Sequence, residues 1–188
     1  YDYEGTILYS YTWDEFVAKN EMPPLPTHHE RLVCQEWNYT LEEVLEQGGR
    51  CDVGAIYTTS DNKLHFIVDS NEDAHIIIPM STSGTFIDVD WGDGNQERYG
   101  NNAAISHTFK KGKYDIAVTS EGEKKIAIGE VEYFMPIKKI HFPSYVVMTI
   151  AAKQFLNIPL EGFTAASNAT ITSAPNVAHL NQGRNWGY

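Results

Sequence analysis

The chain has 188 residues and carries 25 acidic against 14 basic side chains, a net charge of −11. This charge disfavours nucleic acids and anionic membrane surfaces as partners, and no apolar run approaches the ~20 residues of a membrane-spanning helix. We therefore expect no nucleic-acid binding and no membrane insertion. An apolar fraction of 42% and an aromatic fraction of 12% predict a folded, β-rich protein with one large or two small domains.

Residues 1–51 are predicted to form a small N-terminal α/β arm in which a strand precedes a short helix, twice. The apolar segments 7–9 and 32–37 predict the strands. A linker over 22–30 contains three prolines in four positions and is expected to stay extended, as a hinge. Each helix is indicated by a capping box, a threonine followed three residues later by a glutamate: Thr12 with Glu15, and Thr40 with Glu43.

The two cysteines, Cys34 and Cys51, flank the second of these helices. In an oxidising compartment they could form one disulfide. Two buried free thiols are the alternative, and the sequence leaves both open.

Residues 52–134 carry turn signals about every 8–12 residues between short apolar segments, a spacing typical of a β-sandwich. In the clearest strand, Ile87, Val89 and Trp91 alternate with aspartates and so share one face. Two glycines follow and give the backbone the freedom that a tight reversal needs. The segment 113–119 alternates again and predicts a half-buried antiparallel strand.

The segments 89–94, 107–109 and 112–118 read V-D-W-G-D-G, H-T-F and G-K-Y-D-I-A-V. Together they resemble the PKD (polycystic kidney disease) repeat, and more closely the PKD-like domains that precede leucine-rich repeats in BspA-type bacterial surface proteins and related phage proteins. The resemblance implies an immunoglobulin-like β-sandwich, an extracellular module for spacing or adhesion. It also implies that His107 packs inside the sandwich, and that a structural turn rather than a reactive site is formed by Trp91, Gly92, Asp93 and Gly94.

Residues 135–188 differ in character, with shorter apolar segments and no regular alternation. Four short elements are predicted: a strand over 137–143, a short helix or turn over 146–155, and strands over 160–165 and 169–172. This part resembles one or two degenerate leucine-rich repeats of the BspA type. The resemblance implies a C-terminal, β-rich, leucine-rich-repeat-like segment.

Aromatic side chains give the main indication of a binding surface. The 11 tyrosines exceed what a core of this size needs, so some are expected at the surface. Trp37 and Trp91 are expected in the core. Trp13, Trp186 and Tyr188 lie in peripheral segments and are predicted to form an interface.

Sites for chemistry are few. Asp88, Asp90 and Asp93 suggest a calcium site, but Gly92 occupies the third ligand position of an EF-hand loop, so that motif is excluded. A looser calcium site at the turn and a solvated strand edge remain the alternatives. No catalytic motif is present. We therefore expect no catalytic residue, no enzyme activity and no cofactor apart from that calcium ion.

These features predict a non-enzymatic extracellular structural or adhesion protein of a bacterial surface or a phage virion. It would act by rigid display and by self-association, or by association with other surface or virion proteins. A glycan-binding accessory module of a carbohydrate-active protein is the alternative, and it requires a row of exposed aromatic side chains. Because the chain begins with Tyr1, we interpret it as a processed, exported form or an excised piece.

Overall fold

The structure is a computed structural model that describes residues 1–2, 6–27, 31–129 and 136–144, together with the backbone of three short strands further along the chain. Strands dominate these residues, so the predicted mainly β class is confirmed. The elements in chain order are α1 (Trp13–Lys19), β1 (Leu32–Trp37), α2 (Leu41–Glu46), β2 (Ala55–Thr59), β3 (Leu64–Ser70), β4 (Ala74–Asp90), β5 (Gln96–Phe109), β6 (Gly112–Ser120), the 3-10 turn η1 (Glu121–Glu123), β7 (Ile126–Ile128), β8 (Ile137–His141), β9 (Val147–Ile150), β10 (Gly162–Thr164) and β11 (Thr170–Ile171).

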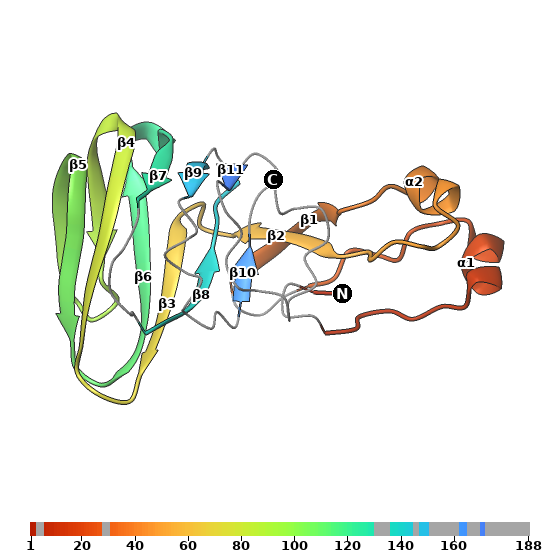
Figure 1. The fold of residues 1–188 in the computed structure, drawn as a ribbon, viewed down its shortest axis with the longest axis horizontal. Coiled ribbons are helices and arrows are strands. Elements are labelled where there is room, and N and C mark those ends of the chain that lie inside the picture. The colour runs from red at the N-terminus through yellow and green to blue at the C-terminus, as the bar shows by residue number, and fades with distance from the viewer. Residues whose placement is uncertain are drawn as a thin grey trace.

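The larger sheet runs in the order β10-β8-β3-β6-β4-β7-β9-β11, with β5 beside β4. The long strand β4 takes part in two groups of strands, because residues 87–90 pair with β6 whereas residues 80–82 pair with β7. β5 follows β4 along both parts, with an irregularity between Ser81 and Phe86. β4 and β5 thus connect two groups of strands around one core, a β-sandwich-like arrangement seen at the left of Figure 1.

The core is built by the alternation of the strands. Leu64, Phe66 and Val68 of β3 are fully buried, and so is Ile126 of β7 from the other group of strands. Trp91 at the end of β4 joins this cluster with no exposed surface. Burial of large apolar side chains of this kind contributes about 1.5–3 kcal/mol each, so the core supplies a rigid body to which the rest is attached.

The reversal between β4 and β5 lies where the sequence predicted it. The Trp91 N–H donates to the Asn95 carbonyl at 3.0 Å, closing the turn. Gly92 and Gly94 have φ values of 74° and 97°, which side chains disfavour. Gly92 has a second requirement, since a Cβ there would lie 2.5 Å from the carbonyl oxygen of Asp115.

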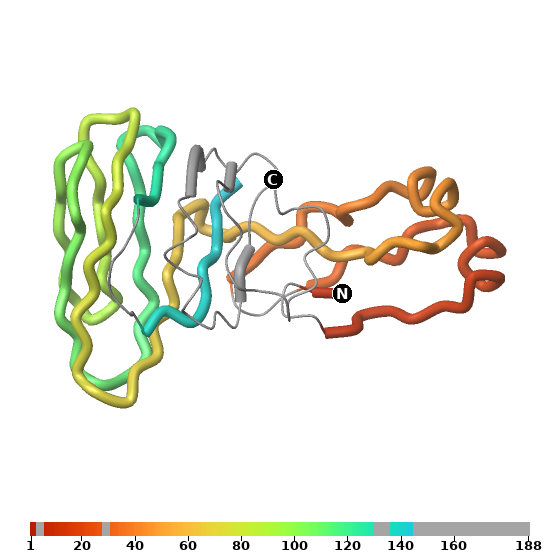
Figure 2. The backbone as a smooth tube through the Cα atoms, in the orientation of Figure 1, coloured from red at the N-terminus to blue at the C-terminus, as the bar shows by residue number. Residues whose placement is uncertain are grey.

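The arm projects from the sandwich and carries both helices at its far end (Figure 1). Figure 2 shows that the chain runs out to α1 and returns, then runs out to α2 and returns. Both predicted capping boxes are formed, with Thr12 and Thr40 as N-caps. β1 pairs with β2 in an antiparallel sheet of its own. The arm therefore includes β2 and extends to Thr59, beyond the boundary predicted after residue 51.

Hydrogen bonds join the N-terminal residue of the arm to the chain that returns from α2, and brace that second excursion internally. The N-terminal ammonium of Tyr1 donates to the Val53 carbonyl at 2.9 Å, and the Ala55 N–H donates back to the Tyr1 carbonyl at 2.8 Å. The buried Asn38 side chain accepts from the Gly54 N–H at 2.8 Å and donates to the Asp52 carbonyl at 3.1 Å. The arm is thus a braced structure and not a pair of free loops.

Two predicted elements are wrong. Residues 7–9 form no strand, because Leu8 packs instead against the small cluster of Leu32, Ala55 and Tyr57. Within 146–155 the structure has the strand β9 over Val147–Ile150 in place of the predicted short helix or turn, since this segment pairs in parallel with β7. The short strands β10 and β11 lie within the predicted segments.

Candidate functional site

The arm carries all the large apolar side chains that are exposed in the described part of the chain. Exposed fractions range from 37% for Tyr11 to 64% for Ile7. The set comprises Ile7, Tyr9, Tyr11, Trp13, Val17, Leu25 and Val33. A gathering of exposed apolar surface on one part of a protein marks an interaction site more often than scattered residues do.

These side chains fall into two groups. Tyr9, Tyr11 and Trp13 line a cleft of about 330 Å³ at the far end of the arm, to which Trp37 also contributes. The aliphatic side chains of Ile7, Val17, Leu25 and Val33 do not line it. We call the first feature the aromatic cleft and these four side chains, which lie at separate positions along the arm, the aliphatic surface.

The walls of the aromatic cleft are fixed by packing. The Trp37 indole N–H donates to the Pro23 carbonyl at 2.9 Å, and its ring meets Tyr9 edge to face at 6.0 Å. Trp13 stacks on Phe16 at 6.0 Å. Its indole also lies so close to Gly49 that a Cβ on that glycine would come within 2.8 Å. This contact joins residues that are far apart in the sequence, so no local pattern in the sequence indicates it.

The lining of the aromatic cleft contains no acidic, basic or histidine side chain. Its polar atoms include the hydroxyl groups of Tyr9, Ser10 and Tyr11. The side chains of the cleft are therefore uncharged, and the charged group among its lining residues is the N-terminal ammonium of Tyr1, which donates to the Val53 carbonyl. The arm around the cleft, residues 1–59, carries eleven acidic and three basic side chains. The cleft suits a neutral ligand with both apolar faces and hydroxyl groups.

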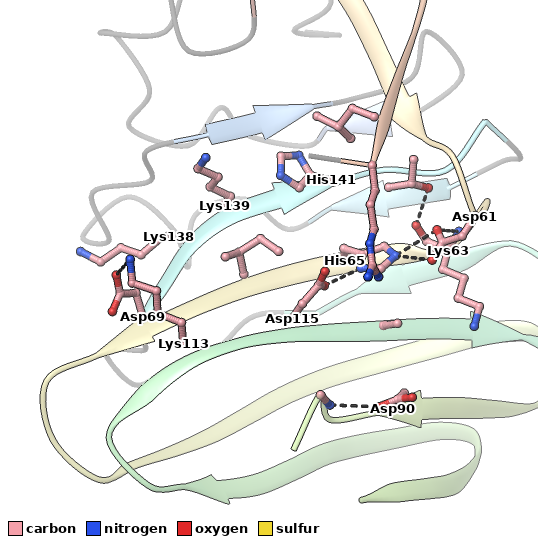
Figure 3. A pocket seen from close by; sticks show the side chains of 16 residues that line it. Asp61, Lys63, His65, Asp69, Asp90, Lys113, Asp115, Lys138, Lys139 and His141 are labelled. Atoms are coloured by element: carbon pink, nitrogen blue, oxygen red, sulfur yellow. Dashed lines mark hydrogen bonds and ion pairs between the residues drawn. The ribbon is translucent and has the colours of Figure 1, made fainter. Parts of the chain in front are cut away.

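A second cavity, of about 770 Å³, lies on the outer face of the sheet beside the base of the arm (Figure 3). Its walls carry charges of both signs. The titratable residues are Arg31, Asp61, Lys63, His65, Asp69, Asp90, Lys113, Asp115, Lys138, Lys139 and His141. The residues of this cavity come from separate strands, so no local motif in the sequence indicates it.

His65 lies between two carboxylates in this cavity (Figure 3). Its Nδ1 is 2.5 Å from Asp115, and its Nε2 is 2.8 Å from Asp61. Both ring nitrogens face carboxylates, as in a protonated imidazolium. Burial of the ring lowers the pKa of His65, but the hydrogen bonds and charges of Asp115 and Asp61 outweigh burial and raise it above its ordinary value.

The carboxylates around His65 are thus engaged within the protein. His141 is the cross-strand neighbour of His65. The Thr59 hydroxyl donates to the Lys63 carbonyl at 2.6 Å, and Lys113 pairs with Asp69 at 3.4 Å. No group of three His, Cys, Asp or Glu side chains among the described residues is placed to hold a metal ion. In this cavity the turn after β2, which ends the arm, contacts β3 and β6 through Asp61, His65 and Asp115.

The three calcium candidates have separate partners in the structure. Asp88 accepts from the guanidinium of Arg98 at 2.7 and 2.9 Å. Asp90 accepts from the Gly92 N–H and from Gln96, each at 2.9 Å. Asp93 accepts from His107 at 2.8 Å. In the described part of the chain these carboxylates form no group that could hold an ion, and the candidate calcium site is not assembled.

The turn itself is stabilised by ring contacts. The His107 ring stacks on Trp91 with their centroids 4.7 Å apart, while its Nε2 reaches Asp93 at the tip of the turn. Trp91 also donates its indole N–H to Glu97 at 3.1 Å. His107 thus lies over the core tryptophan and links the turn to β5. The resemblance implied a histidine packed inside the sandwich, and the structure places its ring half-buried against Trp91.

Cys34 and Cys51 are both free thiols, so the disulfide alternative is not formed in the structure. Each is half-buried rather than buried. Burial, the largest cause, raises the pKa of Cys34 to about 11, and burial together with Asp52 raises that of Cys51. Both thiols are protonated at neutral pH and are weak nucleophiles.

The interface candidates Trp186 and Tyr188 lie outside the described residues, whereas Trp13 is 40% exposed in the aromatic cleft.

Among the described residues, the helices are too short to cross a bilayer. Comparison of the chain with family models, with curated proteins and with solved structures found no match. The resemblances to PKD-like domains and to leucine-rich repeats therefore stay predictions. The features that bear on function are the aromatic cleft and the aliphatic surface of the arm.

Proposed function

We propose that the chain is a non-enzymatic extracellular structural or adhesion module of a bacterial surface or a phage virion. It displays the arm rigidly and associates through it, with further copies of itself or with other surface proteins. One observation carries this proposal. Every large apolar side chain that is exposed in the described part of the chain lies on the arm, away from the core of the sandwich.

Rigid display is supported by the contacts at the base of the arm. The Thr59 N–H, at the end of β2, donates to the Phe142 carbonyl just after β8 at 3.0 Å. In the turn after β2, the Asn62 side chain accepts from the Ser144 N–H at 3.0 Å. The bridge from Asp61 through His65 to Asp115 adds a third connection. An arm held at several points keeps its orientation when the far end is bound.

Association is supported by the aliphatic surface. Ile7, Val17, Leu25 and Val33 leave 44–64% of their surfaces exposed, and burying such side chains against a partner is favourable by about 25 cal/mol per Å² of apolar area. None of them contributes to the aromatic cleft. The aliphatic surface is therefore the part of the arm that we assign to contacts between copies.

Light scattering on the purified chain, with negative-stain imaging of the same sample, tests the proposal. We expect a mass that is a multiple of the 21.2 kDa protomer, and a shift to the protomer mass in the double variant Ile7→Ser/Val17→Ser. Asn102→Ser, an exposed polar position on β5, is the matched control and should keep the multimer. A wild-type chain that stays monomeric at every concentration contradicts self-association.

A further inference from the structure

Three of the aromatic residues that line the cleft, Tyr9, Tyr11 and Trp13, alternate along the chain and form a row. Tyr9 and Tyr11 precede α1, which begins at Trp13, and Figure 2 shows the chain running outward along the arm to that helix. Alternate residues of an extended chain share a side and are about 6.6 Å apart. The row from Tyr9 to Trp13 therefore spans roughly 13 Å, and its members are 38%, 37% and 40% exposed in order.

The rings of this row are held in place before any ligand arrives. Trp13 is fixed between Phe16 and Gly49, and Tyr9 is fixed by the edge of Trp37. The ammonium of Lys19 lies 5.5 Å from the centre of the Tyr11 ring. A ligand that binds to rings already oriented loses less conformational entropy on the protein side, so pre-organisation favours affinity.

The chemistry of the lining selects among ligands. Single-stranded nucleic acids also stack on aromatic rings, but their binding grooves carry positive charge, and the side chains that line this cleft are uncharged. The acidic arm disfavours anionic ligands of any kind. The cleft has a volume of about 330 Å³, at the small end of the ~300–1,000 Å³ range of small-molecule sites. This volume suits a few units of a linear oligomer better than the surface of a folded protein.

We propose that the aromatic cleft binds a neutral oligosaccharide of more than one sugar ring. A pyranose ring has C–H bonds on its faces, which pack on the electron-rich faces of aromatic rings, and hydroxyl groups at its rim, which pair with the hydroxyls of Tyr9 and Tyr11. The row of rings provides one stacking position for each of several sugars. This inference rests on the proposed adhesive function and names the ligand class of the arm.

A glycan array followed by calorimetric titration of the intact chain tests the inference. We expect binding to neutral glycans, with gluco-, manno- and N-acetylglucosamine hexasaccharides as the titrants, and no binding to oligogalacturonate or heparin fragments. Trp13→Ala should weaken the association constant by roughly tenfold, the effect of losing one aromatic contact. Val17→Ala, on the aliphatic surface, should leave it unchanged.

Two glycines give a matched pair that tests the geometry. Gly48 and Gly49 have φ values of 61° and 73°, so an alanine at either position has a similar backbone cost. Only at Gly49 would the new Cβ meet the indole of Trp13, whereas the space around Gly48 is open. Gly49→Ala should therefore reduce sugar binding much more than Gly48→Ala does.

The outcomes separate this inference from the proposed function. No neutral glycan bound on the array, or equal binding by the wild type and Trp13→Ala, overturns the sugar site, and selective binding of an apolar peptide instead would assign the cleft to a protein partner. A multimer that binds no glycan leaves the proposed association standing. A chain that stays monomeric but binds neutral glycans contradicts self-association, and it supports the assignment of the aromatic cleft as a sugar site.

Discussion

At the scale of single residues, His65 is the clearest case of a side chain whose role depends on its neighbours. It lies on the outer face of β3, a position that alternation would make solvent-exposed, yet it is only 5% exposed. Its partners Asp61 and Asp115 come from the turn after β2 and from β6. A histidine held between two carboxylates is stabilised in its protonated form.

The raised pKa of His65 predicts a pH dependence of folding. Because the pKa is raised above the unfolded value of about 6.5, the bridge contributes its full stability below that pH and loses it as the pH rises through the folded-state pKa. Urea unfolding should show that the free energy of unfolding falls as the pH rises from about 6 to about 9. This fall should be smaller in Asp115→Asn than in the wild type. The paired surface residue Asp69 provides the control, since Asp69→Asn removes a surface ion pair of little energetic weight. Identical pH profiles for the wild type and Asp115→Asn would rule out the bridge.

At the scale of elements, the turn between β4 and β5 combines a backbone requirement with a packing requirement. Both glycines of this turn have positive φ values. They differ in their surroundings, because a side chain on Gly92 would collide with the backbone of β6 at Asp115, whereas the space around Gly94 is open. The turn therefore packs closely against β6 at Gly92 and has open space around Gly94.

This difference predicts unequal effects of alanine at the two glycines. A left-handed conformation alone costs a non-glycine residue about 1–3 kcal/mol. Gly94→Ala should lose about that much stability, and Gly92→Ala should lose more, since β6 must also move. Chemical denaturation of both variants measures the free energies of unfolding. Equal losses would show that the strand yields to the new methyl group without cost.

At the scale of the whole molecule, negative charge is concentrated in the arm, and so are the exposed large apolar side chains of the described residues. Residues 1–59 carry eleven acidic and three basic side chains, a net charge of −8. Two arms brought together through the aliphatic surface therefore repel each other at long range. The charge limits association at low ionic strength, while the exposed apolar side chains favour it at short range.

Salt should therefore strengthen the association between copies. At an ionic strength of about 0.1 M the Debye length is about 10 Å, and higher salt shortens the range of the repulsion between arms. Sedimentation or light scattering across a series of NaCl concentrations should show a larger mass at higher salt. A mass that falls with salt would indicate that the copies associate through opposite charges. Because both arms are negatively charged, the contact would then not lie between two arms.

The sequence by itself determined the features that depend on a few neighbouring residues. Thr12 with Glu15 and Thr40 with Glu43 form the predicted helix caps, because a capping box needs only four consecutive residues. The alternation before Trp91 and the glycines after it gave the strand and the turn for the same reason. Trp13 lies exposed on the arm, as its peripheral position indicated, and its part in an interface stays a prediction.

Only the tertiary structure decided the features that depend on partners distant in sequence. The pairing of β2 with β1 set the extent of the arm, and pairing with β7 made β9 a strand where local pattern suggested a helix. The bridge at His65 joins residues 50 positions apart, and Gly49 receives the ring of Trp13 from the other excursion of the arm. Local propensity cannot encode such contacts, because they form only when long loops close and the groups that they bring together are buried at the same place.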